Sequence, residues 1–194
     1  MKRFIIIFPS ILFLIISFCS KEPEGPQESE ELVFRNKPDS LSYDDVEEMM
    51  LKYDFYDKQY NPDGIGFENE FELQAMGLVV NDNNSGLMWQ QNGSDEKLQF
   101  DEAESYISDL NNAKFAGYNN WRLPTLEEAM SLMEPTRESG LYLNPIFTKK
   151  QEWIWTSDQP EDFELYRFIV DFYNGCHGLA PFHFSTYVRA VRSM

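Results

Sequence analysis

Residues 117–133 carry the clearest structural signals in the sequence, and they read GYNNWRLPTLEEAMSLM. Thr125 and Glu128 have the spacing of a capping box, in which each side chain accepts a hydrogen bond from the backbone of the other residue. Apolar residues then recur at helical spacing: Leu126, Ala129, Met130 and Met133. We therefore predict a helix that begins at Thr125 and ends before Pro135, preceded by an extended segment that ends at Pro124.

The Trp121-Arg122-Leu123 run just before this helix has two interpretations. Its aromatic and basic side chains could belong to a binding site. Alternation along an extended segment instead points Trp121 and Leu123 into a core, while Thr125 caps the helix and Arg122 pairs with a nearby acid. We favour the structural interpretation.

Upstream of this segment, the sequence predicts a β-hairpin and a helix. The strands predicted over 78–80 and 87–90 are mostly apolar and enclose a loop of Asn, Asp, Ser and Gly, which is typical of a hairpin. Residues 100–110 carry one apolar stripe at helical spacing, opposite an acidic face.

Downstream of it, the last third of the sequence predicts strands. Residues 153–157, 166–173 and 187–192 are rich in aromatic and β-branched residues, and Asn174-Gly175 turns the chain. We therefore expect an α+β fold, in which a β-hairpin and two helices precede a C-terminal antiparallel sheet.

Four short motifs occur in this order: G-L-M-W at 86–89, W-R-L-P-T at 121–125, W-T-S at 155–157 and V-R-A-V-R at 188–192. Together they make residues 77–192 resemble a family of domains of unknown function, typified by the C-terminal domain of a bacterial collagen-like adhesin (Lcl C-terminal-like). The resemblance implies a C-type-lectin-like fold, related to that of the formylglycine-generating enzymes, whose chain ends meet and whose long loop region carries the binding surface. The adhesin domain is implicated in binding sulfated polysaccharides, for which an acidic chain without a basic cluster is a poor host.

The N-terminus has the pattern of a bacterial lipoprotein signal. Residues 1–18 combine a basic start with an uncharged apolar run that, as a helix, is about 22 Å long, short of the roughly 30 Å of a bilayer core. Cys19 follows in a sequence that resembles a lipobox, although Phe18 stands where a small residue is usual. We expect a signal peptide over 1–18, lipidation of Cys19 and anchoring in the bacterial cell envelope. Cleavage elsewhere and an uncleaved anchor are the alternatives.

Three further parts are predicted after the signal peptide. Residues 19–41 begin with a polar, acidic, Pro-containing stretch and are expected to form a disordered tether. Residues 42–72 are expected to form a short helical extension, in which Ser42 caps a helix over 43–53. Residues 73–194 are the predicted C-type-lectin-like domain.

The charge of the chain limits its partners. It has 16 Lys and Arg residues against 33 Asp and Glu residues, a formal net charge of −17. Such a chain repels phosphate backbones, so nucleic acid is excluded as a partner. It also repels anionic lipid headgroups, so attachment to a membrane requires a covalent or hydrophobic anchor.

The segment YNGCHGLAPFHF, residues 173–184, is the candidate ligand-binding surface. We interpret it as a Gly-rich loop between two strands, where exposed aromatic rings beside imidazoles suit recognition of a glycan or of a protein. The candidate residues are Tyr173, Asn174, His177, Phe182 and His183. The alternative is a core-packing loop in which Phe182 and Phe184 are buried.

Cys176-His177 suggests a nucleophile and a base, but neighbours in an extended chain point in opposite directions. The related formylglycine-generating enzymes use two active-site thiols, and this domain offers only Cys176. We therefore expect a binding protein and not an enzyme. An enzyme of the formylglycine-generating type and a purely structural envelope lipoprotein are the alternatives.

No cofactor and no metal site is predicted. His177 and His183 could ligate a metal with Asp158 or Asp171, but no third ligand falls at motif spacing. The Asn/Asp loop at 81–84 resembles calcium-binding loops without their full pattern, so calcium binding stays an open alternative.

Overall fold

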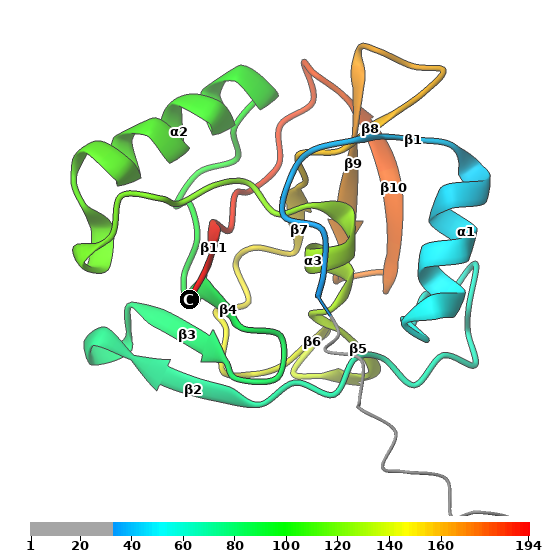
Figure 1. Ribbon diagram of the computed structural model, residues 1–194, viewed down its shortest axis with the longest axis horizontal. Coiled ribbons are helices and arrows are strands. Elements are labelled where there is room, and N and C mark those ends of the chain that lie inside the picture. Colours follow the sequence, from blue (N-terminus) through cyan, green and yellow to red (C-terminus); the bar gives the residue numbers. More distant parts are fainter. Residues whose placement is uncertain (1–32) are drawn as a thin grey trace, which may run out of the picture. The chain divides into compact units, whose positions relative to one another are not determined.

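The computed structural model describes residues 33–194, the part drawn in colour in Figure 1. The predicted signal peptide and Cys19 lie outside the described residues. Within residues 33–194, no helix is both long and apolar enough to cross a membrane.

A four-stranded antiparallel sheet brings the start and the end of the domain together. Its strands are β2 (Phe71–Gln74), β3 (Val79–Asp82), β4 (Leu87–Gln90) and β11 (Val191–Ser193), in the order β11-β4-β3-β2. The predicted hairpin is confirmed as β3 and β4. Because β11 pairs with β4, the C-terminal residues lie beside this hairpin (Figure 1).

The second antiparallel sheet has three strands. They are β7 (Trp153–Trp155), β9 (Tyr166–Asp171) and β10 (Cys176–Pro181), and the order β10-β9-β7 leaves β10 at one edge. Two small sheets complete the strands. β1 (Ser40–Leu41) runs parallel to β8 (Gln159–Pro160), and β5 (Met133–Glu138) pairs with β6 (Leu141–Leu143).

The helices cover these sheets from different parts of the chain. They are α1 (Tyr43–Lys52), α2 (Phe100–Asn112) and α3 (Leu126–Met130), with short 3-10 turns at Ala75–Gly77 and Phe115–Gly117. In Figure 1, α1 lies beside the edge strand β10, and α2 lies on the opposite side of the described unit. The combination of helices with antiparallel sheets confirms the α+β prediction.

The Trp121-Arg122-Leu123 run and the capping box behave as structural elements. Trp121 and Leu123 are buried, and the backbone of Arg122 exchanges two hydrogen bonds of 3.0 Å with Val191. Thr125 Oγ1 accepts from Glu128 N at 3.3 Å, and Glu128 Oε2 accepts from Thr125 N at 3.0 Å. The Arg122 guanidinium also pairs with the Glu128 carboxylate at 2.5 Å. The structural interpretation of this run is therefore confirmed.

Helix α3 is shorter than predicted. It ends at Met130, and Met133 already belongs to β5, so the prediction that the helix extends almost to Pro135 is wrong. The hydroxyl of Ser131 donates to the Glu128 carbonyl at 2.7 Å, and the Asn69 amide donates to the Ser131 carbonyl at 2.8 Å. The Ser131 hydroxyl takes the Glu128 carbonyl, which a continuing helix would pair with Leu132 N, and Pro135 has no N–H to pair with the Ser131 carbonyl.

Residues 33–41 differ from the disordered tether that the sequence predicted through position 41. Phe34 is buried, and its ring lies 5.1 Å from that of Tyr53. Arg35 forms ion pairs with Glu127 at 3.2 Å and with the fully buried Asp158 at 2.9 Å. The local composition gave no sign of this packing, because the two carboxylates that hold Arg35 come from distant parts of the sequence.

Residues 42–72 pack into the same core as the rest of the described unit. The predicted helix is confirmed, with Ser42 and Asp45 forming a capping box. Its apolar face, with Val46, Met49 and Met50, joins a buried cluster that also contains strand residues of both larger sheets. The extension is therefore part of the domain's core.

Candidate ligand-binding site

The candidate segment 173–184 is a strand and not a loop. Residues 176–181 form β10, so Tyr173 and Asn174 lie in the β9–β10 turn while Phe182 and His183 follow the far end of the strand. Six residues in a strand span about 20 Å. The five predicted site residues therefore belong to two separate places, and His177 stands near the first of them.

At the far end of β10, the aromatic rings are used for packing. The Phe182 ring stacks on Phe100 at 5.2 Å and the Phe184 ring on Trp153 at 5.7 Å. The Arg167 guanidinium lies 4.6 Å from the Phe182 ring centroid. This agrees with the core-packing alternative for these two rings, although both keep some exposure. His183 is exposed.

In the β9–β10 turn, the side chains mainly hold the turn itself. Asp171 accepts hydrogen bonds from the backbone of Tyr173 and of Asn174, both at 2.9 Å, and from the Asn174 amide at 2.6 Å. The Tyr173 side chain is half exposed, and the Arg137 guanidinium lies 4.6 Å from its ring centroid. Asn174 is thus committed to the turn, whereas Tyr173 remains a surface aromatic.

His177 is held by a buried carboxylate that the sequence did not single out. Asp57 is fully buried, and its Oδ2 lies 2.9 Å from His177 N and 2.8 Å from His177 Nδ1. Its Oδ1 accepts from the backbone of Gln59 at 2.8 Å and of Tyr60 at 3.0 Å. Burial of Asp57 opposes ionisation, but these hydrogen bonds outweigh it and lower the pKa of the carboxyl group.

The other ring nitrogen of His177, Nε2, has no hydrogen-bond partner among residues 33–194. The His177 side chain is only 10% exposed, and the Tyr60 ring lies against it with centroids 4.8 Å apart. In the neutral imidazole whose Nδ1 carries the proton donated to Asp57, Nε2 presents a lone pair. Asp57 therefore fixes the orientation of the His177 ring, and Nε2 is left without a partner among the described residues.

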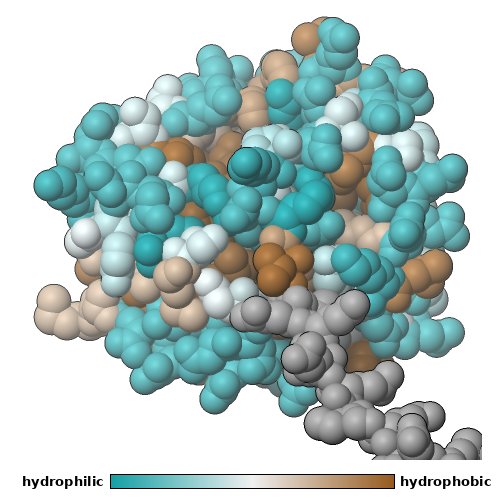
Figure 2. Space-filling model, viewed as in Figure 1, coloured by the Kyte–Doolittle hydropathy of each residue, from teal (hydrophilic) through white to brown (hydrophobic). Residues whose placement is uncertain are grey.

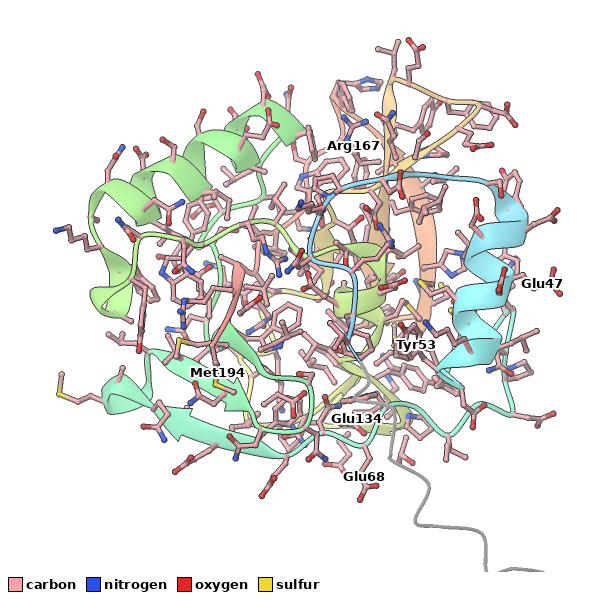
Figure 3. All side chains as sticks on the ribbon, viewed as in Figure 1. Glu47, Tyr53, Glu68, Glu134, Arg167 and Met194 are labelled. Carbon is pink, nitrogen blue, oxygen red and sulfur yellow. The ribbon has the colours of Figure 1, made fainter. Side chains whose placement is uncertain are left out.

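That imidazole lines a pocket between α1 and the start of β10. The pocket has a volume of about 240 Å³. Its lining residues are Tyr43, Val46, Glu47, Met50, Leu51, Tyr60, Asn61 and His177. Tyr43 and Tyr60 are 65% and 60% exposed, so both rings are available to a ligand. Figure 3 shows Glu47 projecting outward from α1.

The turn that carries Tyr60 and Asn61 is rigidly fixed. The Asn61 amide donates to the Phe55 carbonyl at 2.9 Å. A Cβ atom on Gly64 would lie 2.6 Å from both the Asn61 amide nitrogen and the Phe55 carbonyl oxygen, so a side chain there would displace the turn. This wall of the pocket is therefore preorganised.

Cys176 is a free, partly buried cysteine beside this site. Its burial, together with the nearby carboxylates of Asp171 and Asp57, raises the pKa of the thiol to about 11. The thiolate is the nucleophilic form of cysteine, so this environment opposes a nucleophilic role near neutral pH.

The carboxylates considered as metal ligands are engaged in other contacts. Asp158 accepts from Arg35, from Asp39 N at 2.8 Å and from Leu126 N at 2.7 Å. In the loop that was compared with calcium-binding loops, Asp82 accepts from Glu70 N at 2.8 Å, from Asn84 N at 3.2 Å and from the Ser85 hydroxyl. Residues 33–194 contain no group of three or more His, Cys, Asp or Glu side chains that could hold a metal ion.

A family model, described as the Lcl C-terminal domain, matches residues 78–192. The chain belongs to this family. The match runs from the β3–β4 hairpin into β11, and it confirms the resemblance carried by the four sequence motifs. The domain is therefore an adhesin-related one. No curated protein and no solved structure matches the chain.

The family match covers only part of the pocket. His177 lies inside residues 78–192, whereas Tyr43, Glu47, Asp57 and Tyr60 precede them. Sequence reasoning missed these four residues as site residues. The available signs were the helix predicted over 43–53 and the turn chemistry that begins at Tyr60, and neither indicates contact with His177.

Proposed function

We propose that this protein is an exported, lipid-anchored binding protein of the bacterial envelope, and that the pocket between α1 and β10 receives its ligand. The ligand is a glycan or a segment of a protein partner. The observation that carries the proposal is the unpartnered Nε2 of His177, within the described residues, in a pocket flanked by two exposed tyrosines. Exposed aromatic rings beside a fixed polar group are typical of recognition surfaces.

The domain is proposed to have a C-type-lectin-like fold. Supporting this, the pairing of β11 with β4 joins the two ends of the family region, as the sequence resemblance implies. The binding role is proposed to be non-catalytic. The raised pKa of Cys176 favours this, and so does the single thiol in residues 33–194, where a formylglycine-generating-type enzyme needs two.

The partners follow from charge and from the N-terminal sequence. A formal net charge of −17 disfavours nucleic acid and anionic lipid surfaces. The hydrophilic residues that dominate the face in Figure 2 fit a domain displayed in water, held to the membrane through a lipid on Cys19. Incorporation of radiolabelled palmitate into the wild-type chain, lost in Cys19→Ser, is the expected result. Labelling that persists in Cys19→Ser would contradict lipidation there.

The binding function is tested with the full chain in non-ionic detergent, on a glycan array and on an array of envelope proteins, with and without calcium. Two variants, each lacking one exposed tyrosine, serve as a matched pair: Tyr60→Ala in the pocket and Tyr173→Ala in the β9–β10 turn. We expect saturable binding that Tyr60→Ala abolishes and Tyr173→Ala retains. Blank arrays under both conditions would favour the structural alternative, and loss only in Tyr173→Ala would move the site to the turn.

A further inference from the structure

We infer that the pocket between α1 and β10 accepts one cationic side chain, a lysine or an arginine, from a basic segment of a protein partner. This inference rests on the proposed binding function and narrows it to one class of ligand.

The charged lining of the pocket has one sign. Glu47 is the only acidic residue among the lining residues, and no lysine or arginine lines the pocket. Asp44 and Glu48 neighbour Glu47 on the same exposed side of α1, and the buried Asp57 lies behind His177. Lys52 lies on the adjoining surface with Asp44, Glu47 and Glu48 but does not line this pocket, and neither does Lys58. An anionic ligand is repelled here and a cation is attracted.

The fixed imidazole adds a hydrogen-bond acceptor to this charge. Asp57 lies 2.8 Å from Nδ1 of His177 and the imidazole lines the pocket, so Nε2 of the neutral ring is available as an acceptor. An ammonium or guanidinium group carries only donors, and both Nε2 of the neutral ring and the Glu47 carboxylate are acceptors for such a group. This acceptor is independent of the acidic surface, because it comes from a side chain that is 10% exposed and belongs to β10.

The apolar part of the pocket suits the stem of such a side chain. Val46 and Met50 are buried residues of α1 that contribute to the lining, and Leu51 adds an exposed aliphatic surface. Lysine and arginine lay their methylene stems along apolar surface while the charged head reaches polar groups. The exposed faces of Tyr43 and Tyr60 offer cation–π contacts to the same head.

The size of the pocket favours a single side chain over an oligosaccharide. Its volume of about 240 Å³ lies below the roughly 300–1,000 Å³ of pockets that enclose whole small molecules. A multi-ring glycan would extend out over the acidic surface of α1, whereas a peptide needs to insert only one residue.

The test uses blocked peptides and the full chain in non-ionic detergent, followed by calorimetry and NMR titration at low salt. The probes are acetyl-Gly-Lys-Gly-amide, its arginine analogue and its norleucine analogue, which keeps the stem without the charge. Methyl glycosides of neutral hexoses form the second arm. Glu47→Gln removes the lining charge, and Glu48→Gln removes an equal charge from the neighbouring position, which does not line the pocket.

We expect the lysine and arginine peptides to saturate the protein below about 10 mM and the norleucine peptide to bind at least about fivefold more weakly. Glu47→Gln weakens lysine-peptide binding about fivefold and Glu48→Gln less than about twofold. Equal binding of the norleucine peptide, or equal effects of the two variants, overturns the inference. A third outcome separates the two proposals: the glycosides saturate the protein, Tyr60→Ala abolishes their binding, and the lysine peptide does not bind. In that case the cation inference fails while the binding function stands. If no probe binds and the arrays are also blank, both fail.

Discussion

The two ends of β10 carry similar residues, but one end is packed within the domain and the other lines a pocket. Each end has an aromatic ring against a charged or titratable side chain: Phe182 against Arg167 at the far end, and Tyr60 against His177 at the near end. At the far end, Arg167 lies against both stacked rings, Phe182 and Phe100, so the rings are used within the fold. At the near end, Asp57 holds one imidazole nitrogen, the other has no partner among residues 33–194, and the ring lines a pocket. An aromatic ring beside a charged or titratable side chain therefore contributes to packing at the far end, where both groups contact other residues of the domain. At the near end it forms a candidate site, because Nε2 of His177 has no partner in the described part of the chain.

The difference originates outside the family region. The far end of β10 packs on α2, which lies within residues 78–192, whereas the near end meets α1 and the turn around Tyr60, which precede them. The pocket is thus formed jointly by the family domain and by the segment before it. Changes in the exposed residues of this segment that line the pocket, such as Tyr43 and Glu47, are expected to alter ligand choice without changing the domain fold.

The largest expected effect comes from Asp57→Ala, at the near end. The substitution removes a buried carboxylate that accepts from His177 and from two backbone amides, and it leaves those donors without partners. We expect a loss of about 3 kcal/mol in the free energy of unfolding, measured by urea denaturation. The exposed Asp63→Ala is the control and should change it by less than about 0.5 kcal/mol. Equal stability of Asp57→Ala and wild type would show that Asp57 does not hold this end together.

Phe182→Ala, at the far end, is expected to lower stability by about 2 kcal/mol, because Phe182 loses its stacking on Phe100 and its contact with Arg167. Ligand affinity, measured on the still-folded protein, should stay within about twofold of wild type. A large loss of affinity at retained fold would make the far end of β10 part of the binding site.

Acid titration tests how Asp57 stabilises the near end of β10. The folded-state pKa of Asp57 is lowered below its unfolded value, so its contribution to stability is complete above the unfolded pKa, about 4. That contribution is lost as the pH falls through the lower, folded pKa. Wild type should therefore lose more stability than Asp57→Asn between about pH 5 and pH 2 in urea denaturation series. Parallel curves for the two proteins would contradict the assignment.

The smallest expected effect is that of His183→Ala. His183 is exposed and follows the packed end of β10, so its removal should change the free energy of unfolding by less than about 0.5 kcal/mol and leave ligand binding unchanged. Loss of binding in this variant would place the binding site at the far end of β10, where the sequence predicted His183 as a candidate residue.

Local patterns predicted much of the fold. The capping boxes at Ser42 and Thr125 and the β3–β4 hairpin depend on neighbours within a few positions, so their residues are sufficient to identify them. The strand at residues 176–181 was mistaken for a loop, because its glycine and proline weaken the strand pattern while pairing with β9 stabilises it.

The candidate site depends on contacts that no local pattern encodes. His177 was identified as a ligand candidate, but Asp57 lies 120 positions before it, and only the folded chain brings the two together. Arg35 is a similar case, since its partners Glu127 and Asp158 lie 92 and 123 positions away. Both sets of contacts connect residues 33–72 to the family domain. The sequence predicted these residues to be a separate tether and extension, because contacts between distant positions leave no local pattern.

The most direct test of the pocket uses the fact that the chain has two histidines, one at each end of β10. Long-range ¹H–¹⁵N NMR spectra of the full chain in detergent report the ring nitrogens of both during titration with acetyl-Gly-Lys-Gly-amide or with a ligand found on the arrays. We predict that Nε2 of His177 shifts with saturation while both His183 nitrogens stay in place. A shift confined to His183, or saturable binding that moves neither ring, would contradict the assignment of the pocket as the binding site.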